Sequence, residues 1–252
     1  MKWNDITFDY TGTAVLVTGG TGGLGAAIAV AFTAAGAQVT ITGTRASAAD
    51  YAEDLSTYHY LQLDIEDCAS IEAVAAAIPT LDILVNCAGV APAAMGLDES
   101  DPDVFDRAVA MHLTGVHRLC ARLAPKLAQS CLPGGGSVIN VASMSSFFGI
   151  GLLPAYGTAK TGLLGLTRAL SVRWAQQGVR VNAVAAGLTA SKMTAPLLAN
   201  EQINAANLAR VPLGRNGVPQ DIAGAVLFLC SGAASWITGQ TLPIDGGFSI
   251  SG

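Results

Sequence analysis

Charged residues are scarce in this sequence of 252 residues, where they make up 12% of the total, against roughly a quarter in ordinary globular proteins. The 13 basic and 18 acidic side chains leave a net charge of −5, so the chain lacks the basic surface that a nucleic-acid partner requires. Hydrophobic residues make up 51% of the chain. This content excludes an intrinsically disordered protein and predicts a large buried core.

The sequence also lacks an uninterrupted apolar run that could span a membrane. No charged residue occurs between Asp9 and Arg45, or between Lys126 and Lys160. A transmembrane helix needs about 20 consecutive apolar residues, however, and glycine clusters at 19–23 and 134–136 interrupt the two stretches. We therefore expect no membrane span. The first five residues do not resemble a secretory signal either.

Cysteine is infrequent and forms no metal-binding pattern. The five cysteines include no Cys-x-x-Cys pair, and an odd number does not suit a disulfide framework. We expect no metal site, no disulfide and a reduced, cytoplasmic protein.

The chain alternates short β-branched segments with longer Ala- and Leu-rich segments. Strands are expected at 14–17, 38–42, 58–63, 83–85, 137–141, 179–184 and 241–244, and helices near 24–35, 67–77, 102–129, 155–177 and 219–231. Apolar strands separated by helices predict a parallel sheet with helices on both faces. Right-handed connections make this a doubly wound, Rossmann-type α/β fold. We predict a single domain over residues 1–252, with a long, poorly periodic substrate lid at about 187–215.

A glycine-rich turn joins the first predicted strand to the first predicted helix. The turn, Thr18 to Gly25, has the sequence TGGTGGLG. Between a buried strand and a helix, such glycines let backbone N–H groups approach a pyrophosphate at the helix N-terminus. This context predicts a dinucleotide site, and the alternative is a tight turn without a ligand.

The end of the second predicted strand bears on the choice of cofactor. Sites for NAD usually carry an Asp or Glu about 20 residues after the glycines, where it binds the ribose hydroxyl. Thr44 and Arg45 take that place here, with no carboxylate. Because a guanidinium attracts a 2′-phosphate, we predict a preference for NADP(H) over NAD(H). An arginine that is simply solvated is the alternative.

Tyr156 and Lys160 lie four residues apart at the start of a predicted helix, so they share one helix face. A neighbouring cation lowers the pKa of a phenol, which predicts that Tyr156 is an acid–base group. Ser143 follows a buried strand, at the edge of the sheet where open α/β folds bind ligands. Its alternative role is a hydroxyl that closes a turn.

In this combination the chain resembles the classical short-chain dehydrogenase/reductase family over nearly its whole length. The matching residues are the glycine turn, Asp64, Asn86-Cys87-Ala88-Gly89, Ser143, Tyr156-x-x-x-Lys160, Asn182 and Ile244-Asp245-Gly246-Gly247. The resemblance implies hydride transfer between NAD(P)H and a carbonyl or alcohol. Tyr156 would be the general acid/base, Ser143 would hold the substrate oxygen, and Lys160 would bind the nicotinamide ribose and tune Tyr156.

The resemblance also implies a set of cofactor contacts. They are Gly19, Thr21, Gly23, Leu24, Gly25, Thr44, Arg45, Asp64, Ile65, Asn86, Ala88, Gly89, Tyr156, Lys160, Gly187, Leu188, Thr189 and Ser191. Two of these assignments have structural alternatives. Asp64 could cap a helix, and residues 86–89 could be a turn that merely ends a strand.

Two positions depart from the family pattern. His112 stands where the family usually has an Asn that is thought to support a water relay, and Ala186 stands where Pro usually precedes Gly187. Because a neutral imidazole both donates and accepts hydrogen bonds, we predict that His112 serves the relay. A buried packing histidine is the alternative. Ala186 puts the rigidity of its loop in question rather than the chemistry.

Apolar residues are expected around the site: Met95, Phe147, Phe148, Ile150, Leu152, Leu153, Met193 and Leu197. Since residues 144–155 contain no Lys or Arg, they predict a pocket for a neutral hydrophobic ketone or secondary alcohol. The alternatives are an NAD-preferring alcohol dehydrogenase, an idle NAD(P)-binding regulator or scaffold of the same fold, and a sugar-nucleotide epimerase of the extended branch. The chain leaves little room for the last. The resemblance also implies a homotetramer formed through helices 102–129 and 155–177.

Overall fold

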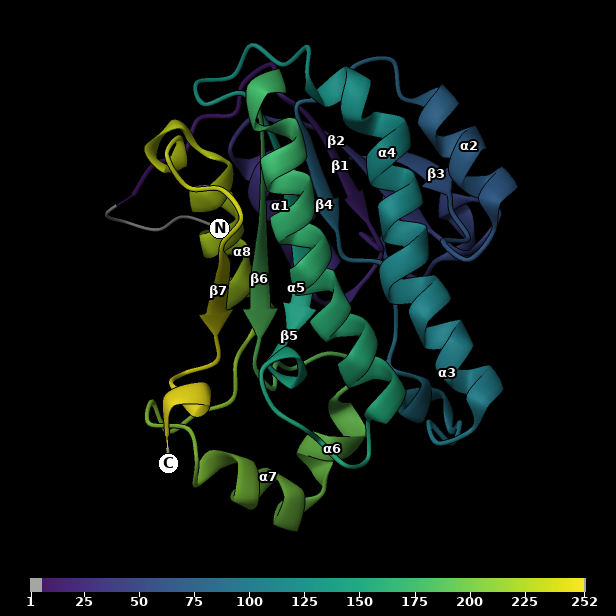
Figure 1. Cartoon of the computed structure of the whole chain (residues 1–252), viewed down its shortest axis with the longest axis vertical. Coiled ribbons are helices and arrows are strands. Elements are labelled where there is room, and N and C mark those ends of the chain that lie inside the picture. Colours follow the sequence, from purple (N-terminus) through teal and green to yellow (C-terminus); the bar gives the residue numbers. More distant parts are fainter. Residues whose placement is uncertain (1–5, 252) are drawn as a thin grey trace.

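The computed structural model describes residues 6–251, in which seven strands form one parallel sheet (Figure 1). In chain order the strands are β1 (Ala14–Thr18), β2 (Gln38–Gly43), β3 (His59–Gln62), β4 (Ile83–Asn86), β5 (Gly136–Ser143), β6 (Val179–Ala186) and β7 (Thr241–Ile244). Their order across the sheet is β3-β2-β1-β4-β5-β6-β7. The Rossmann-type doubly wound sheet that the sequence predicts is confirmed.

Helices cover both faces of the sheet. One face carries α1 (Gly23–Ala34) and α8 (Pro219–Cys230), and the other carries α2 (Cys68–Ala77), α4 (Gly115–Leu127) and α5 (Pro154–Trp174). In Figure 1, α4 and α5 lie in front of the sheet while α1 and α8 lie behind it. Between residues 6 and 251, no helix combines the length and the apolar character that crossing a bilayer would require.

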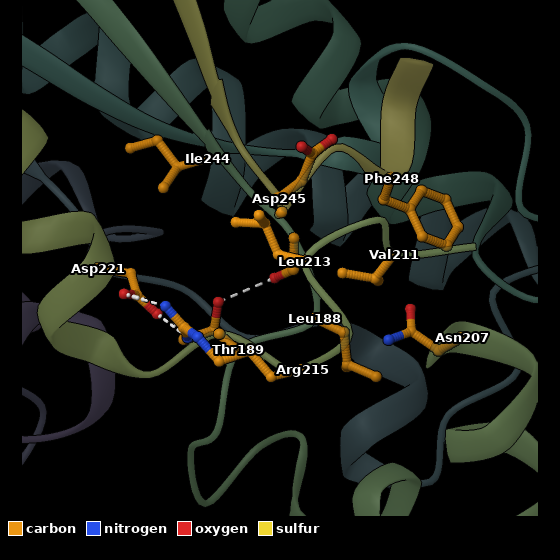
Figure 2. Close-up of a pocket in the computed structure, with 13 residues that line it drawn as sticks. Leu188, Thr189, Asn207, Val211, Leu213, Arg215, Asp221, Ile244, Asp245 and Phe248 are labelled. Atoms are coloured by element: carbon orange, nitrogen blue, oxygen red, sulfur yellow. Dashed lines mark hydrogen bonds and ion pairs between the residues drawn. The ribbon is translucent and has the colours of Figure 1, made fainter. Parts of the chain in front are cut away.

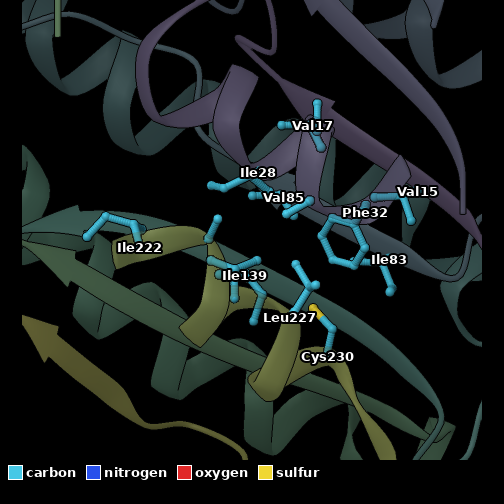
Figure 3. Close-up of a cluster of buried hydrophobic side chains, with 14 of the residues drawn as sticks. Val15, Val17, Ile28, Phe32, Ile83, Val85, Ile139, Ile222, Leu227 and Cys230 are labelled. Atoms are coloured by element: carbon cyan, nitrogen blue, oxygen red, sulfur yellow. The ribbon is translucent and has the colours of Figure 1, made fainter. Parts of the chain in front are cut away.

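The strands divide their side chains between two cores. Val15 and Val17 of β1 point into the core shared with α1 and α8, whereas Leu16 points into the opposite core. Figure 3 shows the first core, where Phe32 of α1 and Leu227 of α8 lie close to the strand side chains. Each fully buried side chain of this size stabilises the fold by about 1.5–3 kcal/mol. Burial on both faces explains why the strands are apolar at successive positions.

The segment 187–215 lies across the carboxyl ends of β5, β6 and β7 (Figure 1). It contains two short helices that the sequence pattern did not reveal, α6 (Ala195–Ala199) and α7 (Glu201–Leu208). The side chain of Asn200 caps α7 by accepting hydrogen bonds from the backbone N–H groups of Gln202 and Ile203. The segment therefore has more regular structure than its lack of periodicity indicates.

The helix predicted near 102–129 is confirmed over 102–127, although its middle has an irregular turn that the sequence did not predict. Helix α3 (Pro102–Val109) passes into a π-helical turn, Ala110–Thr114, before α4 begins at Gly115. Such turns are rare and occur mostly at functional sites. His112 lies in this turn with its side chain buried.

Candidate active site

The predicted site residues meet at the carboxyl edge of the sheet, around β1 and β4. β1 pairs with β2 on one side and with β4 on the other, so the strand order reverses here. Doubly wound sheets bind ligands in the crevice that this reversal opens. The glycine turn follows β1, the turn 86–89 follows β4, and Ser143 ends β5.

The glycine turn has the backbone that its sequence predicts. Gly19 and Gly23 have φ values of +68° and +54°, a region that glycine adopts without strain. A side chain on Gly25 would collide with the carbonyl oxygen of Gly19. Within residues 6–251, no side chain caps α1 and its first turn has no acidic residue. The N–H groups at this helix end can therefore face an anion, which the helix dipole favours.

The turn after β4 is fastened against the glycine turn. The hydroxyl of Thr18 accepts hydrogen bonds from the backbone N–H groups of Cys87 and Ala88, both at 3.0 Å. A Cβ on Gly19 would lie 2.9 Å from the Cα of Ala88, so the two backbones pass in close contact. The turn does end β4, and it also lies where a dinucleotide bound to the glycine turn would pass.

Arg45 is less free than a solvated surface arginine. Its guanidinium carbon lies 4.8 Å from the ring centroid of Tyr51, and the group donates a hydrogen bond to the carbonyl oxygen of Asp50. Both partners belong to the loop that follows β2. Arg45 and the neighbouring Thr44 therefore lie at the end of the cleft where the sequence predicts the adenosine half of the cofactor.

Asp64 does not cap a helix. Its carboxylate accepts a hydrogen bond from the backbone N–H of Glu66 at 2.9 Å, whereas Asp67 caps α2. Ile65 beside it is buried, and its carbonyl oxygen would collide with a side chain on Gly115. Close packing against α4 thus fixes the backbone at this second predicted contact for the adenine.

Tyr156 lies in the first turn of α5 and is partly buried. Burial raises the pKa of Tyr156 to about 12, although a hydrogen bond with the Ser143 hydroxyl lowers it. Ser143 also accepts a hydrogen bond from the backbone N–H of Ser145 at 3.2 Å. Ser143 therefore closes a turn, and its role at the active site stays a prediction.

Lys160 lies beside Tyr156, as the spacing of four residues predicts. Its Nζ is 5.7 Å from the centroid of the phenol ring and donates a hydrogen bond to the carbonyl oxygen of Val141 at 2.6 Å. Burial lowers the pKa of Lys160 to about 8. The prediction of a lowered pKa for Tyr156 is wrong in this structure, because desolvation of the phenolate outweighs any attraction to the ammonium group.

His112 is buried against the same tyrosine. The two rings are perpendicular, with centroids 5.0 Å apart. The imidazole Nε2 lies 3.1 Å from the carbonyl oxygen of Val90, while Nδ1 has no partner among residues 6–251. Burial lowers the pKa of His112 to about 3, so the ring is neutral at physiological pH. Since a carbonyl only accepts, Nε2 carries the proton and Nδ1 offers a lone pair.

The loop after β6 approaches the glycine turn. A Cβ on Gly23 would lie 3.6 Å from the Cβ of Ser191, and the Ser191 hydroxyl is 3.0 Å from that of Thr194. Thr189 donates a hydrogen bond to the carbonyl oxygen of Gly187 at 3.0 Å. These contacts bring the predicted nicotinamide-side residues 187–191 to the same cleft as the predicted pyrophosphate site.

Comparison with known proteins agrees with this geometry. A family model described as enoyl-(acyl carrier protein) reductase matches residues 19–249, which include the glycine turn, Ser143, Tyr156 and Lys160. The chain belongs to the short-chain dehydrogenase/reductase family. It is accordingly an NAD(P)-dependent oxidoreductase.

The similarity between this short-chain dehydrogenase/reductase and its relatives extends over almost all of the chain. It is 33% identical to D-threitol dehydrogenase of Mycolicibacterium smegmatis, covering 98% of this chain and 96% of the relative. It is 36% identical to cis-4-hydroxycyclohexanecarboxylate dehydrogenase of Sinomonas cyclohexanicum, covering 93% and 95%. Among solved structures, the RhlG/NADP active-site complex of Pseudomonas aeruginosa has a TM-score of 0.85 and 33% identity, covering 96% and 98%.

The sequence did not reveal the role of Glu99, a buried residue that contacts Tyr156. Its side chain is only 3% exposed. The carboxylate accepts hydrogen bonds from the backbone N–H of Tyr156 at 2.8 Å and from that of Ala93 at 3.2 Å. A carboxylate near a helix N-terminus is stabilising. Its polar surroundings in the sequence, residues 98–101, are typical of an exposed loop and gave no signal of this role.

A cation beside the loop after Ser143 was missed as well. The guanidinium carbon of Arg210 lies 4.2 Å from the ring centroid of Phe248 and 5.8 Å from that of Phe148. The two phenyl rings are themselves 5.5 Å apart. Arg210 thus brings a positive charge to residues 144–155, which contain none of their own.

Next to this stack is a cavity of about 190 Å³ in the short-chain dehydrogenase/reductase fold (Figure 2). Leu188 and Thr189 form part of its wall, together with Phe248 from the C-terminal segment. An ion pair between Arg215 and Asp221, 2.7 Å long, contributes another part. The cavity therefore separates the loop after β6 from the C-terminal segment and the start of α8.

Proposed function

We propose that this chain is an NADP(H)-dependent oxidoreductase that interconverts a ketone and a secondary alcohol on a neutral, hydrophobic small molecule. The observation that carries the proposal is the placement of Tyr156 beside Ser143, which lowers its pKa by hydrogen bonding, and beside the Lys160 ammonium group, 5.7 Å from the phenol ring. This group lies at the same sheet edge as the glycine turn. An acid–base group and a dinucleotide site thus share one cleft.

The residues at this edge fit a dinucleotide. The uncapped start of α1 suits the pyrophosphate, and the close approach of Gly19 to Ala88 leaves backbone rather than side chains along the cleft. The contacts that we assign to the cofactor are Gly19, Thr21, Gly23, Leu24, Gly25, Thr44, Arg45, Asp64, Ile65, Asn86, Ala88, Gly89, Tyr156, Lys160, Gly187, Leu188, Thr189 and Ser191. The bound nicotinamide supplies or accepts the hydride.

Three side chains handle the substrate oxygen and its proton. Ser143 and Tyr156 donate hydrogen bonds to the carbonyl oxygen, and Tyr156 delivers its proton to that oxygen as the alcohol forms. The ammonium group of Lys160 stabilises the phenolate that remains, because buried charges interact strongly. Positioning and stabilisation of the developing charge account for the catalysis. In oxidation each transfer runs in reverse.

His112 serves this exchange without changing its own charge. With a pKa of about 3, the imidazole does not take up a proton at neutral pH. Its unpartnered Nδ1 accepts a hydrogen bond from a water molecule or from the Lys160 ammonium group when either approaches. His112 is therefore a positioning residue of the relay, and its lone pair supplies the acceptor that the usual Asn provides through its amide oxygen.

Two observations support the choice of NADP(H). Arg45 is the cation nearest in sequence to the predicted 2′-phosphate position, and the end of β2 has no Asp or Glu of the kind that binds the ribose in NAD sites. A solved relative with a TM-score of 0.85 is described as an NADP complex.

For the substrate, the exposed apolar side chains around the cleft support a hydrophobic molecule. Met95, Phe147 and Leu197 are 40%, 44% and 42% exposed. A second candidate is a hydrophobic molecule with a carboxylate, since Arg210 stacks on Phe148 of the loop after Ser143. The name of a relative, cis-4-hydroxycyclohexanecarboxylate dehydrogenase, combines both features in one substrate.

We also propose a homotetramer in the cytoplasm. The resemblance to the family carries this proposal, and α5, one of the two helices it implicates, exposes Val172 to 80%. All five cysteines are free, as suits a reducing compartment.

The decisive experiment is a substrate panel assayed separately with NADPH and NADH. The panel pairs a cyclic ketone with the same ring bearing a carboxylate. We expect turnover with NADPH to exceed that with NADH, and the neutral ketone to be the better substrate. Better turnover of the acid would favour the second candidate, and that preference should disappear in Arg210→Ala. Absence of turnover with every ketone and alcohol would overturn the proposal in favour of an idle, cofactor-binding protein.

A further inference from the structure

Tyr51 places a phenol between the glycine turn and the end of β2. Its hydroxyl accepts a hydrogen bond from the backbone N–H of Arg45 at 3.1 Å. The hydroxyl groups of Thr21 and Thr44 lie near enough to act as hydrogen-bond donors that lower the pKa of Tyr51. A Cβ on Gly43 would collide with the Tyr51 hydroxyl. The phenol oxygen thus occupies a pocket whose walls come from both predicted cofactor segments.

The groups around this oxygen are those that a phosphate needs. Thr21, Thr44 and the Arg45 amide present hydrogen-bond donors to one point, and the Arg45 guanidinium stacks on the ring that reaches that point. Although burial acts to raise it, the pKa of Tyr51 is lowered by these hydrogen bonds and one with Tyr60. Donors that stabilise a phenolate oxygen also stabilise a phosphate oxygen. The oxygen of Tyr51 therefore marks an anion-binding point.

Several contacts hold the segment 48–53 with Tyr51 in this position. The hydroxyl of Tyr60 donates a hydrogen bond to the carbonyl oxygen of Arg45 and lies 3.5 Å from that of Tyr51. Glu53 forms an ion pair of 2.7 Å with Lys192 of the segment 187–215. The side chains of this ion pair are exposed to 45% and 87%, so the pair is weak. Ala48 and Tyr51 also pack against the edge of the core shared with α1 and α8, so movement of the phenol gives up part of that packing.

We propose that the Tyr51 hydroxyl occupies the subsite for the 2′-phosphate of NADP(H), and that this hydroxyl must leave for the phosphate to bind. The inference rests on the proposed preference for NADP(H). In the cofactor-free protein the threonines and the Arg45 amide are already satisfied by the phenol. Binding exchanges that oxygen for a phosphate oxygen and releases the Arg45 guanidinium from the ring to meet the phosphate.

With competition of this kind, the apparent affinity for the phosphate falls in proportion to the fraction of protein in which Tyr51 has left the subsite. Removing one neutral hydrogen-bonding group changes such an equilibrium by roughly two- to tenfold. Tyr51→Phe removes the oxygen and keeps the ring beneath Arg45. We therefore expect it to bind the 2′-phosphate more tightly than the wild type.

The test measures binding of adenosine 2′,5′-bisphosphate and of 5′-AMP to the full chain by isothermal titration calorimetry. We expect Tyr51→Phe to bind the bisphosphate about two- to tenfold more tightly, with a smaller gain for 5′-AMP. Tyr58→Phe is the matched control, since the ring of Tyr58 also packs against the core shared with α1 and α8, and it should leave both affinities unchanged. If Tyr51→Phe fails to fold, Tyr51→Met makes the same test.

Other outcomes would overturn the assignment. Unchanged affinity would show that Tyr51 is a bystander, and weaker affinity that it binds the phosphate directly. An equal gain for both ligands would mean that Tyr51 blocks the whole adenosine site rather than the 2′-phosphate subsite. If the wild type and Tyr51→Phe both prefer 5′-AMP, the proposed NADP(H) preference fails too, whereas turnover with NADH would leave the proposed oxidoreductase chemistry standing.

Discussion

The two ends of the cleft differ in burial: one lies inside the protein and the other at its surface. At the end predicted to hold the nicotinamide, Lys160 and His112 are 6% and 1% exposed, and burial shifts the pKa of each well below its usual value. At the adenosine end, Arg45 and Tyr51 make their contacts within a surface loop, which an exposed ion pair and the stacking of the Arg45 guanidinium on the Tyr51 ring help to hold in place.

This difference indicates where each property of the enzyme is decided. At the buried end, water cannot screen charge. The proton chemistry therefore depends on a few side chains, and no other residue can replace them. At the exposed end, salt and water weaken each contact, and several hydrogen-bond donors together bind the phosphate, so that no single one is essential. We therefore expect substitutions to abolish activity at the first end and to shift cofactor choice at the second.

The largest effect should come from Tyr156→Phe, at the buried end. Removing the proton donor should lower kcat by roughly 10²- to 10⁴-fold, the usual contribution of a general acid or base. NADPH binding should survive, weakened by no more than about tenfold, because the variant loses at most one neutral hydrogen bond to the cofactor. Steady-state rates and fluorescence titration with NADPH test the two statements. Full activity in this variant would remove Tyr156 from the mechanism.

Arg45→Ala should have a smaller effect, confined to cofactor choice. Loss of a charge-assisted hydrogen bond to the phosphate should weaken NADPH binding by roughly ten- to a hundredfold and leave NADH binding nearly unchanged. The loss should shrink as ionic strength rises. Arg122→Ala, which breaks an exposed pair with Glu72, is the control. Equal weakening of both cofactors would contradict the assigned subsite.

The smallest effect concerns stability in acid and the burial of His112. The unfolded imidazole has a pKa of 6.5 and the folded one a pKa of about 3. Below the unfolded value only the unfolded chain binds the proton, so stability falls as the pH drops through this window, by about 1.4 kcal/mol per pH unit. His112→Asn should lose about 2 kcal/mol less than the wild type between about pH 6.5 and pH 4.5.

Urea unfolding at the two pH values measures this difference. His59→Asn is the matched control, because His59 lies exposed on the edge strand β3, and it should keep the acid sensitivity of the wild type. An identical acid loss in wild type and His112→Asn would show that the imidazole of His112 is already hydrated or charged in the folded protein.

Local pattern was enough to predict the features that depend on neighbouring residues in the sequence. The glycine turn needs small residues at fixed positions, and the side-by-side placement of Tyr156 and Lys160 needs only a helix. The sheet follows from apolar segments of strand length. These features are correct in the structure because tertiary contacts add to them and do not oppose them.

The features that the sequence did not reveal depend on contacts between distant residues. Glu99 meets the Tyr156 amide across 57 positions, and Arg210 meets Phe148 across a similar span. The pKa of Tyr156 was expected to be lowered and is raised. The spacing of four residues between Tyr156 and Lys160 reveals the nearby cation, but it does not reveal how deeply the phenol is buried. The role of Tyr51 is likewise invisible in a loop whose composition is ordinary.

The π-helical turn between α3 and α4 has a consequence for attempts to redesign this chain. Each added residue rotates the downstream helix by roughly 100° about its axis, so the wide turn sets the angular phase between two helices that look continuous in the sequence. Forcing these residues into regular α-helical geometry, with none of them removed, would swing Leu119 and Leu123 out of their core. The π-helical turn thus keeps α4 at the rotation that buries its leucines, and a regular helix through the same residues would be less stable.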